Sequence, residues 1–177
     1  MIRDATPDDF PQILALNAEA VRFLSPLTEA RLHHLHGQAA CHRVVALDGR
    51  VAGFLLALRE GADYDSVNFR WFVERYRRFL YVDRVVVHAD LRGQGIGCAL
   101  YDDLISLAAR ARVAFITCEF DLVPANPASL AFHRRYGFRE VGRQAAAGGQ
   151  KRVSLQLRDA ADPDLASKPV PGVGEWT

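Results

Sequence analysis

Residues 87–97 have the composition and spacing of an anion-binding loop. A predicted strand ends there, and glycines follow at three alternate positions, Gly93, Gly95 and Gly97, at the start of a predicted helix. Glycine allows the main chain to adopt positive φ and to approach a ligand closely. The free N–H groups of a first helical turn point toward one place and attract a phosphate. With Arg92 beside them, these residues predict recognition of a phosphate or pyrophosphate.

Two other nucleotide-binding loops fit this spacing less well. A Walker-type loop needs Gly-Lys-Ser/Thr, which is absent. A dinucleotide fold needs G-x-G-x-x-G directly after the strand and an acidic residue about 20 positions later. Glu119 lies near that distance, but the spacing is G-x-G-x-G and five residues separate Val87 from Gly93. A glycine-rich turn without a ligand is the structural alternative.

The elements around this loop alternate between strands and helices, which predicts a mixed α/β sheet. An Asp48-Gly49 pair between two β-rich runs indicates a hairpin. The predicted helices cover residues 8–22, 28–36, 97–111 and 128–136, and the predicted strands cover residues 42–47, 51–58, 79–87, 113–120 and 150–157.

The segment 60–78 is rich in aromatic residues and arginine. Phe69, Phe72, Tyr76 and Phe79 recur at the spacing of one helical face, with arginines on the other faces. Two interpretations stay open: a helix packed on the sheet, or a lid whose aromatic and arginine side chains meet a substrate or a partner chain.

Composition limits the class of protein. The chain has 177 residues, 22 Lys+Arg, 21 Asp+Glu and a formal charge of +1, which gives no overall attraction to nucleic acid or to an acidic membrane. Its three cysteines lack metal-ligand spacing. The charged start and the absence of a long apolar run predict a soluble, cytoplasmic protein. Residues 159–177 are predicted to be a tail.

Two motifs resemble those of the GNAT superfamily of N-acetyltransferases. The run from Arg92 to Gly97 matches the signature R/Q-x-x-G-x-G/A, and the segment from Asn126 to Phe138 is similar to an Asn-led helix that closes in Gly-Phe. The resemblance covers about residues 1–157. Residues 118–126, together with residues 79–84, resemble an uncharacterised bacterial subgroup of predicted acetyltransferases.

The resemblance implies a mixed, mostly antiparallel central sheet, flanked by helices on both faces and splayed at its central strands. The expected domain spans residues 1–158, with 60–78 as an inserted aromatic and arginine-rich helix and 159–177 as the tail. The expected co-substrate is acetyl-CoA, with no metal. By position, its binding residues are Val85, Val86, Val87, Arg92, Gly93, Gln94, Gly95, Ile96, Gly97, Asn126, Ser129 and His133.

Catalysis requires a base, because an alkylammonium group is not a nucleophile. By resemblance, Asp83 and Glu119 are the candidates, although Asp83 could instead pair with an arginine and Glu119 could cap a loop. Many family members carry a tyrosine seven residues after the Asn, where this chain has His133. His133 is expected to act as an acid, to hydrogen-bond the thioester or CoA, or to be structural.

The acceptor pocket is expected to form from residues 23–36, 60–78 and 144–149, without nucleic-acid or membrane partners. The expected reaction moves an acetyl group directly to a primary amine of a small molecule or peptide, in a possible homodimer. A non-catalytic acyl-CoA-binding or sensing module of the same fold is the alternative.

Overall fold

The computed structural model describes residues 1–160, so the predicted tail lies outside the described residues beyond Ala160. Its strands form a seven-stranded sheet in the order β1-β2-β3-β4-β5-β7-β6. Neighbouring strands are antiparallel except β4 and β5, which are parallel. The strands are β1 (Ile2–Asp4), β2 (Ala39–Leu47), β3 (Arg50–Arg59), β4 (Phe79–Val87), β5 (Phe115–Val123), β6 (Arg139–Ala146) and β7 (Lys151–Asp159).

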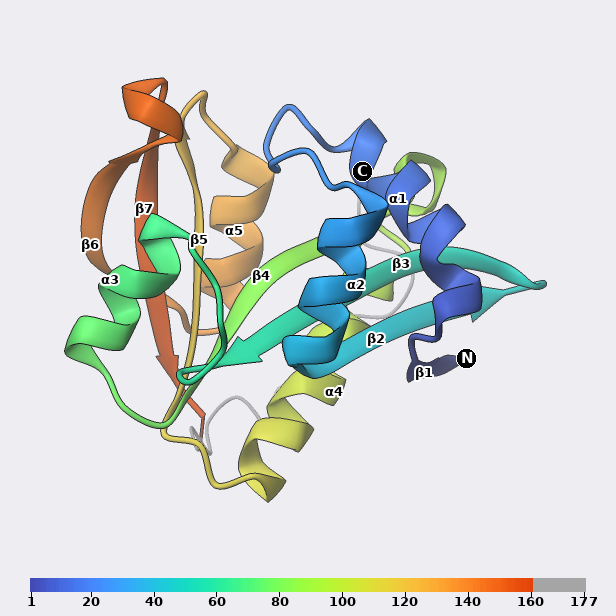
Figure 1. Cartoon of the computed structure of the whole chain (residues 1–177), viewed down its shortest axis with the longest axis horizontal. Coiled ribbons are helices and arrows are strands. Elements are labelled where there is room, and N and C mark those ends of the chain that lie inside the picture. The colour runs from blue at the N-terminus through green and yellow to red at the C-terminus, as the bar shows by residue number, and fades with distance from the viewer. Residues whose placement is uncertain (161–177) are drawn as a thin grey trace.

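Helices cover both faces of this sheet (Figure 1). On one face, α1 (Phe10–Glu19), α2 (Glu29–Gln38) and α3 (Val67–Arg75) bury Phe10, Leu32, Phe72 and their neighbours. On the other face, α4 (Ile96–Arg110) packs through Leu100 and Leu104, and α5 (Pro127–Arg135) packs beside it. Three single-turn 3-10 segments complete the described elements: Pro7–Asp9, Ala89–Leu91 and Ala147–Gly149.

The two central strands separate soon after they meet. β4 and β5 pair only from Phe79 opposite Phe115 to Tyr81 opposite Thr117. Figure 1 shows them diverging from that point, with α5 behind the gap. The sheet is therefore splayed at its centre, as the sequence predicted, and the main chain of β4 beyond Tyr81 lacks a strand partner on its β5 side.

A β-bulge lies at the start of this divergence. Leu56 of β3 pairs with Arg84 and Ala57 pairs with Val82, so Asp83 has no partner in β3. An extra residue in one strand breaks the alternation of side chains between the two faces. Asp83 and Arg84 therefore lie on the same side of the sheet, where Arg84 Nε donates to Asp83 Oδ2 at 2.6 Å.

The aromatic segment packs on the sheet. Its helix is shorter than predicted, because α3 spans only Val67–Arg75, Tyr76 ends it and Phe79 already belongs to β4. The rings of Phe69 and Phe72 are buried against Tyr81 of β4. These rings serve as core and not as the face of a lid.

Two edge strands were not predicted from sequence patterns. β1 has three residues, and β6 has no fully buried residue, so neither carries a strong hydrophobic alternation. β6 is held instead by its register with β7 and by Trp71, whose ring lies so close to Gly142 that a Cβ there would approach Trp71 Cζ2 to 2.6 Å.

Replacing Phe72 by Ala is expected to lower the free energy of unfolding by about 3–5 kcal/mol, because this side chain is fully buried. The matched control is Val73→Ala, whose side chain on the same helix is 41% exposed and whose loss is expected to cost less than about 1 kcal/mol. Urea denaturation of both variants measures the difference. Equal costs would show that α3 is not packed on the sheet.

Candidate active site

The glycine loop presents unpaired main-chain amides at the start of α4. Gly93 and Gly95 have φ of 78° and 82°, a region that favours glycine. The first helical hydrogen bond runs from the Ala99 amide to the Gly95 carbonyl. Within residues 1–160, the amides from residue 93 to residue 98 make no hydrogen bond. This arrangement fits an anion, because several N–H groups and the positive end of the helix dipole converge there.

The side chains around this loop stabilise it without blocking it. Arg92 and Gln94 are exposed, and they donate back to the carbonyls of Val87 and Asp90. No atom lies within 4 Å of the position that a Cβ would take at Gly93 or Gly95. Ile96 is the first residue of α4, and its side chain is buried in the core. Its amide still has no hydrogen-bond partner among the described residues.

The end of β4 supplies further free main-chain groups. The His88 amide donates to the Ala52 carbonyl, so the β3 pairing alternates such that Val86 faces β3. Val85 and Val87 therefore turn their N–H and C=O groups toward the gap left by β5. The three valines are thus not equivalent. The main-chain groups of Val85 and Val87 point toward the gap, whereas those of Val86 pair with β3.

Two of the predicted binding residues on α5 organise the helix itself. Asn126 is the N-cap, and its Oδ1 accepts from the Ser129 amide at 3.1 Å. The Ser129 hydroxyl lies 3.1 Å from His133 Nδ1. Both side chains therefore have local partners at the base of the gap.

His133 is part of the packing between α5 and α4. Its side chain is buried, Nδ1 donates to the Ser129 carbonyl at 2.7 Å, and Nε2 accepts from the Tyr101 hydroxyl at 2.8 Å. Burial lowers the pKa of His133 to about 4, so the ring is neutral near pH 7. Both ring nitrogens have hydrogen-bond partners, and the neutral ring carries no extra proton to donate. This arrangement favours a structural role for His133 over a role as a general acid.

Glu119 lies on β5 just after the divergence from β4. β5 is longer than predicted and continues to Val123, so Glu119 is within the strand and not at its end. Its Oε1 accepts from Tyr81 Oη and from Asn68 Nδ2, each at 2.9 Å, while Oε2 is buried without a partner among the described residues. Burial raises the pKa of Glu119 to about 7, against the effect of these two donors.

Asp83 is engaged in a buried ion pair. Its side chain is 4% exposed, and it accepts from Arg84 Nε and from the Tyr64 hydroxyl. Arg84 in turn donates to Asn17 Oδ1 of α1 at 2.8 Å. The structure thus brings both predicted carboxylates to the α3 face of the gap, but only Glu119 keeps an oxygen without a partner.

Sequence analysis did not identify the neutral groups that surround Glu119. Asn68 lies within the aromatic segment and has no distinctive spacing there. Tyr81 lies within the largely apolar strand sequence FLYVDRVVV, which gives no sign of a polar contact. Both donate to Glu119 because α3 crosses over β4 and β5, an arrangement that has no local sequence signal.

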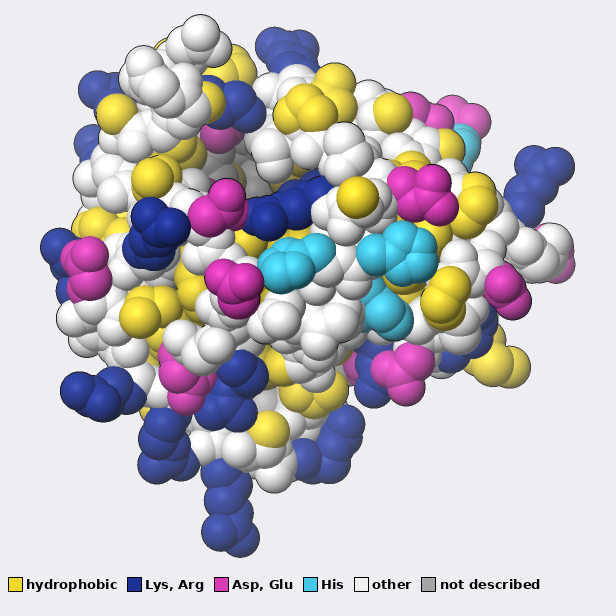
Figure 2. All heavy atoms as spheres, in the orientation of Figure 1, with side chains coloured by type: hydrophobic (Ala, Val, Ile, Leu, Met, Phe, Trp, Pro, Cys, Tyr) yellow, Lys and Arg dark blue, Asp and Glu magenta, His cyan; other side chains and the backbone are white. Residues whose placement is uncertain are grey.

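One of the segments predicted to form the acceptor pocket, residues 23–36, begins beside β5 and β7. Lys151 donates to the Phe23 carbonyl at 3.0 Å and to Asp121 Oδ2 at 2.9 Å, which joins the α1–α2 connection to both strands. Figure 2 shows the surface recessed between this connection and the β6–β7 hairpin. The arginines of α3 are exposed, and Arg75 lies over the Trp71 ring.

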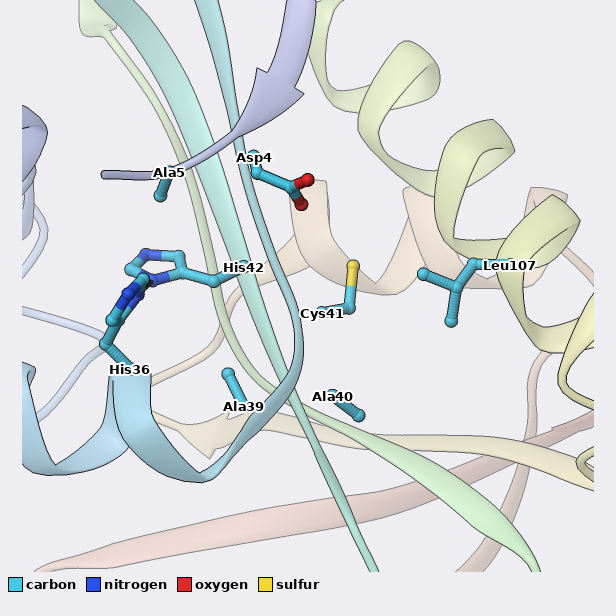
Figure 3. Close-up of a pocket in the computed structure, with 8 residues that line it drawn as sticks. All are labelled: Asp4, Ala5, His36, Ala39, Ala40, Cys41, His42 and Leu107. Atoms are coloured by element: carbon cyan, nitrogen blue, oxygen red, sulfur yellow. Dashed lines mark hydrogen bonds between the residues drawn. The ribbon is translucent and has the colours of Figure 1, made fainter.

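Histidines gather over α2 on the same face (Figure 2). A small cavity of about 180 Å³ lies beside them, at β2 and near the far end of α4 from the glycine loop. Figure 3 shows the His36 and His42 rings together on one side of β2 and Cys41 and Leu107 on the other. Burial lowers the pKa of His42 to about 4. This cavity is separate from the candidate active site.

The described residues hold no group of three side chains suited to a metal ion. Their helices also include none that is both long and apolar enough to cross a membrane.

Comparison with known proteins identifies the family. A sequence profile described as "Acetyltransferase (GNAT) family" matches residues 4–138. The chain therefore belongs to the GNAT acetyltransferases, as the two motifs predicted. Among proteins of curated function, none matches this sequence.

Solved structures share the fold at low identity. Ard1 from Thermoplasma volcanium has a TM-score of 0.74 at 18% identity, covering 90% of this chain and 96% of that one. A ribosomal-protein-alanine N-acetyltransferase from Brucella melitensis has a TM-score of 0.68 at 24% identity, covering 90% of this chain and 99% of that one. The structure of yncA, a putative acetyltransferase from Salmonella typhimurium with its cofactor acetyl-CoA, has a TM-score of 0.70 at 18% identity. The match covers 97% of this chain and 98% of that one.

The neutral state of His133 predicts a dependence of stability on pH. Its pKa is about 4 in the folded chain and about 6.5 when unfolded, so the unfolded state binds more protons between these values. The stability that His133 contributes is therefore complete above pH 6.5 and is lost as the pH falls toward 4, on the order of 3 kcal/mol.

The His133→Gln variant should lack this part of the pH dependence, measured by urea denaturation at a series of pH values. His34→Gln, at an exposed histidine of α2, is the control. If the free energy of unfolding of His133→Gln still falls with pH as it does in the unchanged protein, His133 is not the source of this pH dependence.

Proposed function

We propose that this protein is an acetyl-CoA-dependent N-acetyltransferase that moves an acetyl group directly to a primary amine of a small molecule or peptide. The observation that carries the proposal is the set of unpaired amides from residue 93 to residue 98 at the start of α4. Family membership and the fold shared with yncA, whose structure contains acetyl-CoA, support it.

The residues present fit the pyrophosphate and pantetheine of this co-substrate. The positive φ at Gly93 and Gly95 leaves room for a close approach to the amides. Arg92 adds a positive charge at the loop. The main-chain groups of Val85 and the Val87 amide, which have no strand partner on the β5 side, suit an amide-bearing arm that lies along β4, and an amide of this strand is the proposed donor to the oxyanion.

Glu119 is the proposed general base. The incoming ammonium must lose a proton before its nitrogen attacks the thioester carbon, and Glu119 Oε2 accepts that proton directly or through one water. A carboxyl with a pKa of about 7 is ionised often enough at neutral pH to serve and basic enough to take the proton. Asp83 is the weaker candidate because Arg84 and Tyr64 occupy its oxygens.

The departing sulfur needs no acid from His133. A thiol has an ordinary pKa of about 8.5, so the thiolate is a good leaving group. As the tetrahedral intermediate collapses, the C–S bond breaks, the amide forms and the thiolate leaves with the electron pair. The acceptor, the cytoplasmic location and the homodimer stay predictions.

Gly95→Ala is expected to weaken acetyl-CoA binding at least about tenfold, because an L-residue disfavours φ of 82° and the amides would turn away. Gly97→Ala is the matched control: a Cβ there makes only ordinary contact, 3.6 Å from the Phe132 ring. Titration calorimetry compares the two variants. Equal affinities of the two variants for acetyl-CoA would show that the glycine loop does not bind it.

Glu119→Gln is expected to lower kcat/KM by about 10²–10³-fold at pH 7.5 with little change in acetyl-CoA affinity. In the unchanged enzyme, protonation of Glu119 should reduce kcat/KM as the pH falls below about 7. Ionisation of the amine affects both enzymes alike, so the ratio of their pH profiles isolates Glu119.

Release of free CoA thiol with a panel of amines measures these rates, and mass spectrometry identifies the product. Glu74→Gln, exposed on α3, is the control for loss of a carboxylate. Full activity in Glu119→Gln would eliminate the proposed base, and absence of turnover with every amine would contradict the proposed function.

A further inference from the structure

The two oxygens of Glu119 differ in their surroundings. Oε1 accepts two hydrogen bonds, from Tyr81 Oη on β4 and from Asn68 Nδ2 on α3, both at 2.9 Å. Oε2 is buried and has no partner in the described chain. Because Oε1 is saturated with donors, Oε2 is the oxygen left to receive a proton.

Asn68 is itself held by a third element. Gln144 Nε2, on β6, donates to Asn68 Oδ1 at 2.6 Å. An ionised carboxylate can only accept, so Asn68 must turn its NH₂ group toward Glu119 and its carbonyl oxygen toward Gln144. Gln144 must then present its own NH₂ group. The two amides form a chain with one direction, from β6 through α3 to β5.

We infer that Asn68 and Gln144 are positioning residues, which keep Glu119 ionised and leave its Oε2 free for the proton of the acceptor amine. This inference rests on the proposed role of Glu119 as the base. The amides do not titrate themselves, so they act through the direction of their hydrogen bonds.

The charges around Glu119 explain why such donors matter. Burial is the main cause that raises its pKa, and the carboxylates of Asp83 on β4 and Asp121 on β5 raise it further. The cations nearby are engaged elsewhere, since Arg84 pairs with Asp83 and Lys151 pairs with Asp121.

The remaining neighbours carry no charge at neutral pH. On β7, Leu155 lies opposite Glu119. The hydroxyls of Tyr64 and Tyr81 stay protonated, because burial raises the pKa of both. The opposing donors are therefore Tyr81 and Asn68, and of these only Asn68 depends on another side chain for its orientation.

Two substitutions remove the amide donor that Asn68 presents to Glu119. Asn68→Asp is nearly isosteric and replaces a donor to Glu119 by a second carboxylate. Gln144→Glu replaces the donor to Asn68 by an acceptor, so the Asn68 amide should turn over and face Glu119 with its oxygen. Both changes disfavour the ionised form of Glu119.

We expect the acidic limb of kcat/KM to move up by about one pH unit or more in both variants. The rate at pH 7 should then fall about fivefold or more, while the rate at pH 9 stays within about twofold and the KM for acetyl-CoA is unchanged. The control is Gln150→Glu, which adds the same charge at an exposed position of the same hairpin and should leave the limb in place.

A second measurement does not need turnover. Carbon-13 labelling of glutamate allows the Glu119 carboxyl to be titrated by NMR in the protein without acetyl-CoA, with Glu119→Gln as the assignment. An upward shift of this pKa in Asn68→Asp and in Gln144→Glu supports the inference. If Asn68→Asp fails to fold, Gln144→Glu, half-exposed on β6, gives the answer alone.

The outcomes separate the two hypotheses. A Glu119-dependent enzyme whose acidic limb and NMR titration are unmoved in the variants overturns the positioning role. Lower stability with an unchanged pH profile does the same, because that is the signature of a structural contact. If the unchanged protein has no turnover, the proposed function fails, while the NMR titration still decides whether these amides keep Glu119 ionised.

Discussion

The divergence of β4 from β5 is the constraint on which the site depends. Three residue pairs join the strands before they separate, and the separation leaves the main chain of Val85 and Val87 without a strand partner on one side, where Arg92 donates to the Val87 carbonyl. Unpaired main-chain groups inside a fold are costly unless water or a ligand satisfies them. Glu119 lies on β5 just beyond the last of these pairs, and the start of α4 follows the end of β4.

A buried ion pair lies at the bulge where this divergence begins. An arginine as buried as Arg84 would be strongly destabilising without a partner. Arg84 is satisfied by Asp83 beside it and by Asn17 of α1, which links the bulge to that helix. Loss of one member would leave a charge uncompensated and would disturb the strand end that leads to the glycine loop.

Three carboxylates line this region, and the structure treats them differently. Asp83 and Asp121 each pair with a cation, whereas Glu119 is contacted by neutral donors only. A cation at hydrogen-bond distance favours the ionised form of a carboxyl more strongly than a neutral donor does. Burial raises the pKa of Glu119 to about 7, and the two neutral donors oppose that rise only in part.

The sequence by itself determined the family, the order of most elements and the place of the glycine loop before a helix. These follow from local signals: glycines at alternate positions, apolar runs, capping residues and the Asn-led helix. The edge strand β6 escaped prediction because an exposed edge needs no hydrophobic alternation. Only the tertiary structure decided which polar groups are buried and which side chains they contact. It buried His133 between two helices and brought Asn68 and Gln144 to Glu119 from elements distant in the chain, because hydrogen-bond partners and burial depend on packing rather than on spacing.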